Sequence, residues 1–130
     1  MQPKTISPFI AEHAAPAIGP YSHGVVCTGR MVFLSGQIAL SSEGAMIGTT
    51  VAEQSTQVFH NIRTILKTQG ATLDNVVKAT VFLADMNSFA EMNACYSDAF
   101  GHHKPARSAV EVSRLPKDAL VEIEVIACID

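Results

Sequence analysis

Two helix-start signals divide this chain and limit the folds that it can adopt. Thr50 to Glu53 and Ser88 to Glu91 both have the S/T-x-x-E pattern of a capping box, in which hydroxyl and carboxylate bind main-chain N–H groups at a helix start. After the first signal, apolar residues recur at a period of about 3.6 as far as Leu66, and Gly70 follows where a left-handed helix end is expected. The second signal begins an apolar stripe from Phe89 to Phe100. The sequence therefore predicts one helix from Thr50 and another from Ser88.

Short runs rich in Val, Ile, Phe and Thr predict the strands. The runs Gly24–Thr28 and Met31–Ser35 flank a Gly-Arg turn and indicate an antiparallel hairpin. Asn75–Leu83 predicts a central strand between the helices. Arg107–Val112 and Leu120–Cys128 predict a second hairpin with a long loop, and an N-terminal strand would bring the total to about six.

This order of elements predicts an α+β protein in which two helices cover one face of a mixed β-sheet of about six strands. No linker or repeat interrupts residues 1–130, so we expect a single domain. Only 16% of the residues are charged, against about 25% in ordinary domains. Because charged residues are scarce and one sheet face stays bare, we expect that face to pack against copies of the chain. A monomer with an unusually apolar surface is the alternative.

Several classes of protein are disfavoured by composition. Three widely spaced cysteines, Cys27, Cys95 and Cys128, form neither a disulfide framework nor a zinc pattern. Residues 1–16 resemble neither a secretory signal nor a transit peptide, and no apolar run is long enough to cross a bilayer, so we expect a soluble, cytoplasmic protein. A net charge of -3 and the lack of a basic cluster argue against nucleic acid as a partner.

The most informative candidates for chemistry are Arg107 and two acids of the last strand. Strand alternation places Glu122 and Glu124 on one face of an otherwise apolar strand. Buried carboxylates need a cation nearby or a bound proton, and Arg107 is the obvious cation. A hairpin centred on Pro116 would set Arg107 opposite Val125 and favour Glu124 as its partner. An ordinary ion pair or a solvated strand face explains the same spacing.

Other candidate motifs are weaker. His102 and His103 are adjacent and lack a third ligand at a useful spacing, so we expect no metal site. Ser22 and His23 occur without the G-x-S-x-G elbow of a serine hydrolase, and neither a G-x-G-x-x-G motif nor a P-loop is present. The sequence therefore calls for no metal or nucleotide cofactor.

Four stretches of the chain, taken in order, carry a resemblance to a known family. They are Ile18–Tyr21, Leu34–Gln37, Asn87–Tyr96, and the block Pro105–Ser108, Arg114–Asp118 and Val121–Glu124. The family that they resemble is that of the RidA (YjgF) reactive-intermediate deaminases, also described as endoribonuclease L-PSP, and the resemblance covers essentially the whole chain. It implies a chorismate-mutase-like subunit, assembled as a homotrimer with active sites between subunits. It also implies metal-independent hydrolysis of 2-iminopropanoate or 2-iminobutanoate to a 2-keto acid and ammonia.

The resemblance also implies roles for individual residues. Arg107 would grip the substrate carboxylate, and Glu122, in preference to Glu124, would orient the attacking water. Ala109 stands where many members carry a cysteine, so no thiol can act there, and the hydrolysis needs none. Further substrate-binding positions of the family are matched by Tyr21, Ser35, Gly36 and Asn93.

Two other functions fit the same family or the same residues. One is a single-strand RNA endoribonuclease that inhibits translation. Against it, the chain has no Trp and only two Tyr to stack on bases, and no basic cluster to bind the phosphates. The other is a non-catalytic module that binds small acids through Arg107.

Overall fold

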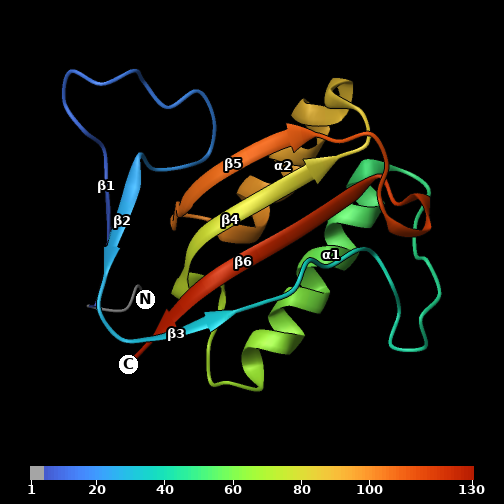
Figure 1. Ribbon diagram of the computed structural model, residues 1–130, viewed down its shortest axis with the longest axis horizontal. Helices are drawn as coiled ribbons and strands as arrows, with labels where there is room; N and C mark the ends of the chain where they lie inside the picture. Colours follow the sequence, from blue (N-terminus) through green and yellow to red (C-terminus); the bar gives the residue numbers. More distant parts are fainter. Residues whose placement is uncertain (1–4) are drawn as a thin grey trace.

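The computed structural model describes residues 5–130, which form two α-helices and six strands (Figure 1). Three short 3-10 turns, at Leu73–Asn75, Met86–Ser88 and Pro116–Asp118, connect these elements. Neither helix is long and apolar enough to cross a membrane. The elements are β1 (Ile6–Phe9), β2 (Gly24–Cys27), β3 (Arg30–Phe33), α1 (Val51–Lys67), β4 (Val76–Leu83), α2 (Phe89–Phe100), β5 (Ala106–Glu111) and β6 (Val121–Ile129).

The strands form two sheets. The larger has the order β3-β6-β4-β5, with β5 parallel to β4 and the other neighbours antiparallel. The smaller contains β1 and β2 alone. The helices α1 and α2 both lie behind the larger sheet in Figure 1, so one of its faces is covered and the other is open.

Both predicted hairpins are wrong. The strand β2 pairs with β1, whereas β3 pairs with β6, so Cys27 faces Ile6 and Met31 faces Cys128. The long apolar strand β6 has two edges, and β3 pairs with one of them and not with β2, the strand that precedes it in sequence. The strands β5 and β6 flank β4 because the chain between them crosses the end of β4, where the N–H of Val112 donates to Leu83 and that of Ala84 to Leu120.

The first capping box is confirmed and the second is wrong. Thr50 Oγ1 accepts from the N–H of Glu53 at 3.1 Å, and Glu53 Oε1 accepts from the N–H of Thr50 at 3.2 Å. Ser88 is the last residue of the 3-10 turn that precedes α2, and its side chain makes no capping hydrogen bond. Asp85 instead caps the 3-10 turn. Glu91 instead accepts from the N–H of Ala52 at 2.7 Å, which ties the starts of α1 and α2 together.

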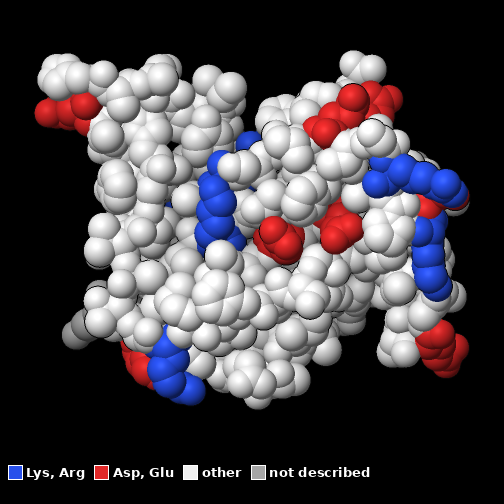
Figure 2. Space-filling view, in the orientation of Figure 1, with Lys and Arg blue, Asp and Glu red and all other residues white. Residues whose placement is uncertain are grey.

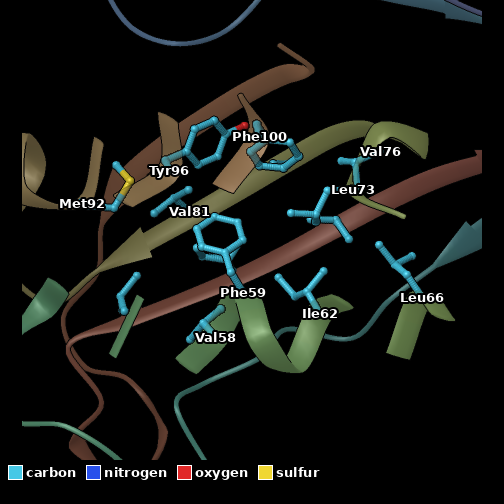
Figure 3. Close-up of a cluster of buried hydrophobic side chains, with 14 of the residues drawn as sticks. Val58, Phe59, Ile62, Leu66, Leu73, Val76, Val81, Met92, Tyr96 and Phe100 are labelled. Atoms are coloured by element: carbon cyan, nitrogen blue, oxygen red, sulfur yellow. The ribbon is translucent and has the colours of Figure 1, made fainter. Parts of the chain in front are cut away.

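The core lies between the helices and the larger sheet (Figure 3). Phe59 of α1 packs edge to face against Tyr96 and Phe100 of α2, with ring centroids 5.9 and 5.7 Å away. Alternate residues of β4 and β6 complete this core and are fully buried. Buried aromatic pairs of this geometry contribute about 0.5–1.5 kcal/mol beyond the area that they bury.

The open face of the larger sheet is partly covered by β1 and β2. At one end, Ile6, Val77 and Cys128 form a second, small core under the two-stranded sheet. The rest of this face is mostly uncharged, with a few acidic and basic groups over the central strands (Figure 2). Phe33 is 72% exposed there and Val110 is 43% exposed. The predicted bare sheet face is therefore present.

Candidate functional site

Arg107 projects from β5 toward the helices. It aligns with Ala79 of β4, whose side chain is buried under them. Its Nη1 donates to Asn93 Oδ1 of α2 at 2.6 Å. The guanidinium carbon lies 4.8 Å from the ring centre of Tyr96, 5.5 Å from that of Phe89 and 5.4 Å from that of Tyr21. One amide and three aromatic rings therefore hold the guanidinium in place.

The charge of Arg107 has no partner of opposite sign. The side chain is half-buried, and among residues 5–130 no carboxylate forms an ion pair with it. Burial lowers the pKa of Arg107, but an arginine remains protonated at neutral pH. The rings offset only part of the cost of removing this charge from water. Such a guanidinium favours a bound anion, and the fork of its N–H groups suits a carboxylate.

A loop between β1 and β2 closes one side of the guanidinium. The hydroxyl of Tyr21 accepts from the N–H of Ile18 at 3.1 Å, and the N–H of Tyr21 donates to the carbonyl of Gly19 at 2.8 Å. A Cβ at Gly19 would lie 2.9 Å from Nη2 of Arg107. Glycine at this position therefore lets the main chain approach the charge closely.

The space in front of Arg107 is small and mainly apolar. A pocket of about 160 Å³ is lined by the side chains of Ile18, Tyr21, Phe89, Arg107 and Ala109. Of two larger hollows, the one of about 390 Å³ beside the end of α1 is lined by exposed Arg63 and Lys67 and by half-buried Asp74. The other, of about 600 Å³ between α1 and residues 37–48, is lined by no Lys, Arg, Asp or Glu. The pocket at Arg107 combines an apolar wall with a half-buried cation, which neither of these two hollows does.

A second group of predicted residues lies on the open face. The chain after β3 pairs with β6 through two main-chain hydrogen bonds between Gln37 and Ile123, 2.9 and 3.1 Å long. This pairing places Gly36 directly against Glu122: a Cβ at Gly36 would overlap the carboxylate oxygen and lie 2.9 Å from Cδ. Ser35 is exposed beside them, and no described residue donates a hydrogen bond to the half-buried Glu122.

The structure does not bring Arg107 and Glu122 together within one chain. Arg107 aligns across β4 with Val125, whereas Glu122 aligns with Phe82 on the opposite face of the sheet. The predicted pairing of Arg107 with Val125 is wrong, because β4 lies between their strands and Ala79 pairs with both. Glu124 is also on the open face and exposed, so the predicted ion pair between it and Arg107 is wrong.

Sequence reasoning assigned Phe89 and Tyr96 to the apolar stripe of α2 and missed their contact with Arg107. Phe89, Asn93 and Tyr96 are spaced by four and three residues, so one face of α2 presents all three side chains. The sequence signal for this contact was the amide of Asn93, which lies between Phe89 and Tyr96 on one face of α2. Elsewhere in residues 5–130, no three His, Cys, Asp or Glu side chains lie close enough to share a metal ion.

Comparison with known proteins identifies the family. The family model described as Endoribonuclease L-PSP matches residues 11–129. A RutC family protein of Pyrococcus abyssi is 50% identical over 120 residues, which cover 92% of this chain and 94% of that protein. The 2-iminobutanoate/2-iminopropanoate deaminase of Escherichia coli is 44% identical over 127 residues, covering 95% of this chain and 96% of that one.

Solved structures agree with this assignment. The crystal structure of RidA from an Antarctic Psychrobacter has a TM-score of 0.74 and 37% identity, and the match covers 95% of this chain and 99% of that one. The fold class predicted from the sequence, a chorismate-mutase-like α+β subunit with both helices on one sheet face, is confirmed. The chain therefore belongs to the endoribonuclease L-PSP family, the RidA-type group that its sequence motifs indicated.

Proposed function

We propose that this protein hydrolyses small 2-imino acids, such as 2-iminopropanoate and 2-iminobutanoate, to 2-keto acids and ammonia. The observation that carries the proposal is the half-buried Arg107, which has no carboxylate partner among the described residues and faces a small apolar pocket. A 2-imino acid supplies the missing carboxylate and a short alkyl group for the apolar wall. The 44% identity to a protein named as such a deaminase supports this choice of substrate.

Arg107 binds the substrate carboxylate through two N–H groups. Asn93 accepts a hydrogen bond from one N–H of the guanidinium and thereby fixes the direction in which the remaining N–H groups point. Tyr21 and the other two rings keep the guanidinium from turning. The alkyl group of the substrate then lies against Ile18, Phe89 and Ala109. The binding energy of the carboxylate is used to position the imine carbon.

Glu122 orients and deprotonates the attacking water. It takes one proton of the water and delivers it to the imine nitrogen, as the water oxygen bonds to the carbon and a carbinolamine forms. When the C–N bond breaks, its electron pair leaves with nitrogen and the hydroxyl proton passes to nitrogen. The products are a keto acid and ammonia. Ser35 and the main chain of Gly36, which lie beside Glu122, hold polar groups of the substrate.

The complete site requires two chains. Arg107 and Glu122 project from opposite sheet faces, so a neighbouring copy must supply one of them. The open face, with exposed Met31, Phe33 and Val110, is the surface that such a copy would cover. We propose a homotrimer, because a closed ring gives each of its subunits one complete site. No metal or nucleotide cofactor is required for this route.

The test is a coupled assay in which a dehydratase generates 2-aminoacrylate and keto-acid release is timed. We expect the protein to accelerate release, and Arg107→Ala to lower kcat/KM by about 100-fold or more through loss of the carboxylate anchor. Arg63→Ala, which removes an exposed arginine of α1, is the matched control and should act like the wild type. Equal turnover by Arg107→Ala and the wild type would refute the proposal.

The family's other description, endoribonuclease, remains the competing activity. Cleavage of single-stranded RNA that stays with the pure protein and is lost in Arg107→Ala would favour it. Binding of 2-oxobutanoate without any imine turnover would instead favour an acid-binding module. We expect the protein to act in the cytoplasm, although a yeast relative 42% identical to it is named as mitochondrial.

A further inference from the structure

The loop that closes over Arg107 is long and is held at few points. We call residues 10–23, which join β1 to β2, the strap; it forms the large loop at the upper left of Figure 1. The ring of Tyr21 in the strap packs against Arg107, and a Cβ at Gly19 would lie 2.9 Å from Nη2 of Arg107. Most residues of the strap are exposed, so packing alone does not set its course. Its position must come from specific hydrogen bonds.

One anchor attaches the end of the strap to the edge of the larger sheet. Ser22 Oγ donates to the carbonyl of Lys104 at 2.5 Å, and the N–H of Ser22 donates to the carbonyl of Pro105 at 3.2 Å. This anchor lies just before Ala106, where β5 begins. It fixes the strap next to Arg107 but leaves residues 11–15 without support.

The imidazole of His23 provides the second anchor. Its Nδ1 accepts from the N–H of Ala11 at 2.9 Å, and its Nε2 donates to the carbonyl of Ala15 at 2.6 Å. One ring thus binds two main-chain groups four residues apart. An N–H donor at Nε2 and a lone pair at Nδ1 occur together only in the neutral Nε2–H tautomer.

We infer that His23 is a positioning residue: its neutral imidazole holds the strap so that Gly19 and Tyr21 stay closed over Arg107. The consequence for turnover rests on the proposed function. The ionisable side chains of the strap itself are Glu12, His13 and Tyr21. Those on the adjoining strands are Cys27 of β2, Lys78 of β4, and Arg107 and Glu111 of β5. The approach to β5 adds His102, His103 and Lys104. Both ring nitrogens of His23 are bound to main-chain groups and to none of these side chains.

A second proton on His23 would break one of these bonds. The charged ring carries N–H at both nitrogens, so Nδ1 would face the N–H of Ala11 as donor against donor. The bond to Ala15 would remain. Protonation of the ring in acid should therefore loosen the strap, and substrate binding should weaken with it.

The first experiment examines the ring without reference to activity. In ¹⁵N-labelled full-length protein at pH 7.5, two-bond ¹H–¹⁵N spectra report the tautomer of each histidine, and a His23→Gln spectrum assigns the His23 signals. We expect the Nε2–H tautomer for His23, and faster hydrogen exchange at Ala11 as the pH falls, after correction for the intrinsic rate. An Nδ1–H tautomer, or unchanged corrected exchange of Ala11 down to pH 5, would overturn the inference.

The second experiment compares two substitutions. Glutamine presents one acceptor and one donor and does not titrate. His23→Gln should therefore keep the wild-type dissociation constant for 2-oxobutanoate at pH 7.5. Unlike the wild type, it should not bind more weakly at pH 5.5. His23→Ala should raise that constant about fivefold to thirtyfold at both pH values. His60→Gln, an exposed histidine of α1, is the control and should retain the wild-type pH profile.

The outcomes separate the two proposals. If His23→Gln binds as weakly as His23→Ala at pH 7.5, or keeps the wild-type pH profile, then His23 does not position the strap. If the wild type fails to bind 2-oxobutanoate and does not hydrolyse the imine, the proposed function fails, and the tautomer and exchange measurements still decide whether His23 holds the strap.

Discussion

Arg107 and Glu122 lie on strands that flank β4 but project from opposite faces of the sheet. The row that contains Arg107 continues through Ala79 to Val125 under the helices, and the row that contains Glu122 continues through Phe82 to Val110 on the open face. Under the proposed function, one subunit therefore presents two half-sites, one that binds the substrate carboxylate and one that accepts a proton.

Two glycines should affect different kinetic constants. Gly36→Ala places a methyl group where the carboxylate of Glu122 lies and pushes that group away from its water, so kcat should fall by about tenfold or more. Gly19→Ala crowds Nη2 of Arg107 and should act mainly by raising KM. Steady-state kinetics of both variants provide the comparison. A raised KM with unchanged kcat in Gly36→Ala would contradict the role of Glu122.

Tyr96 should contribute its ring to the fold and not its hydroxyl. The side chain is fully buried, stacks under Arg107, and leaves its hydroxyl without a hydrogen-bond partner among the described residues. Removing a buried, unpaired hydroxyl relieves its desolvation, so Tyr96→Phe should keep or raise the free energy of unfolding, by up to about 1 kcal/mol. Urea denaturation measures this change. A loss larger than about 1 kcal/mol would show that the hydroxyl has a partner.

The aromatic cluster between the helices should be the most sensitive part of the core. Phe59 is 2% exposed and contacts both Tyr96 and Phe100. Phe59→Ala should lower the free energy of unfolding by about 3–5 kcal/mol because it removes buried area and leaves a cavity. Phe33→Ala on the open face is the control: the isolated subunit should lose little, since that ring is 72% exposed. Equal losses would contradict the assignment of the core.

The cap of α1 should make stability depend on acid pH. Hydrogen bonds from Thr49 and Thr50 lower the pKa of Glu53 below its usual 4.5. A carboxyl whose pKa is lower in the folded state stabilises the fold above the unfolded-state pKa, and this contribution is lost as pH falls through the folded-state pKa. Glu53→Gln should therefore reduce the melting temperature at pH 7 and make it less dependent on pH below about 4.5. An identical acid dependence in both proteins would contradict the capping bond.

Local signals predicted the helices well and the strand partners poorly. The bonds of Thr50 and Glu53 involve neighbours in sequence, so a four-residue pattern sufficed to start α1. Strand pairing depends on edges that only the folded sheet offers, and so β3 paired with β6 instead of β2. Ser88 failed as a cap because the 3-10 turn before it changed the entry of the chain into α2.

The sequence indicated candidate residues for the site but neither their arrangement nor the aromatic rings around Arg107. Motif resemblance named Arg107, Glu122 and their neighbours, and strand alternation correctly placed Glu122 and Glu124 on one face. Which face Arg107 occupies depends on the insertion of β4 between β5 and β6, a long-range event that no local pattern contains. The aromatic surroundings of Arg107 were hidden for the same reason, because α2 reaches it only through the folded core.

Complementation between two inactive variants tests the shared site most directly. Arg107→Ala and Glu122→Gln proteins are denatured together, refolded and assayed for imine hydrolysis, with each variant refolded alone as the control. If each site takes its arginine and its glutamate from different chains, random mixing of equal amounts restores about one quarter of the wild-type activity. Activity that stays at the level of the separate variants, in a mixture shown to contain hybrid oligomers, would contradict a site built from two chains.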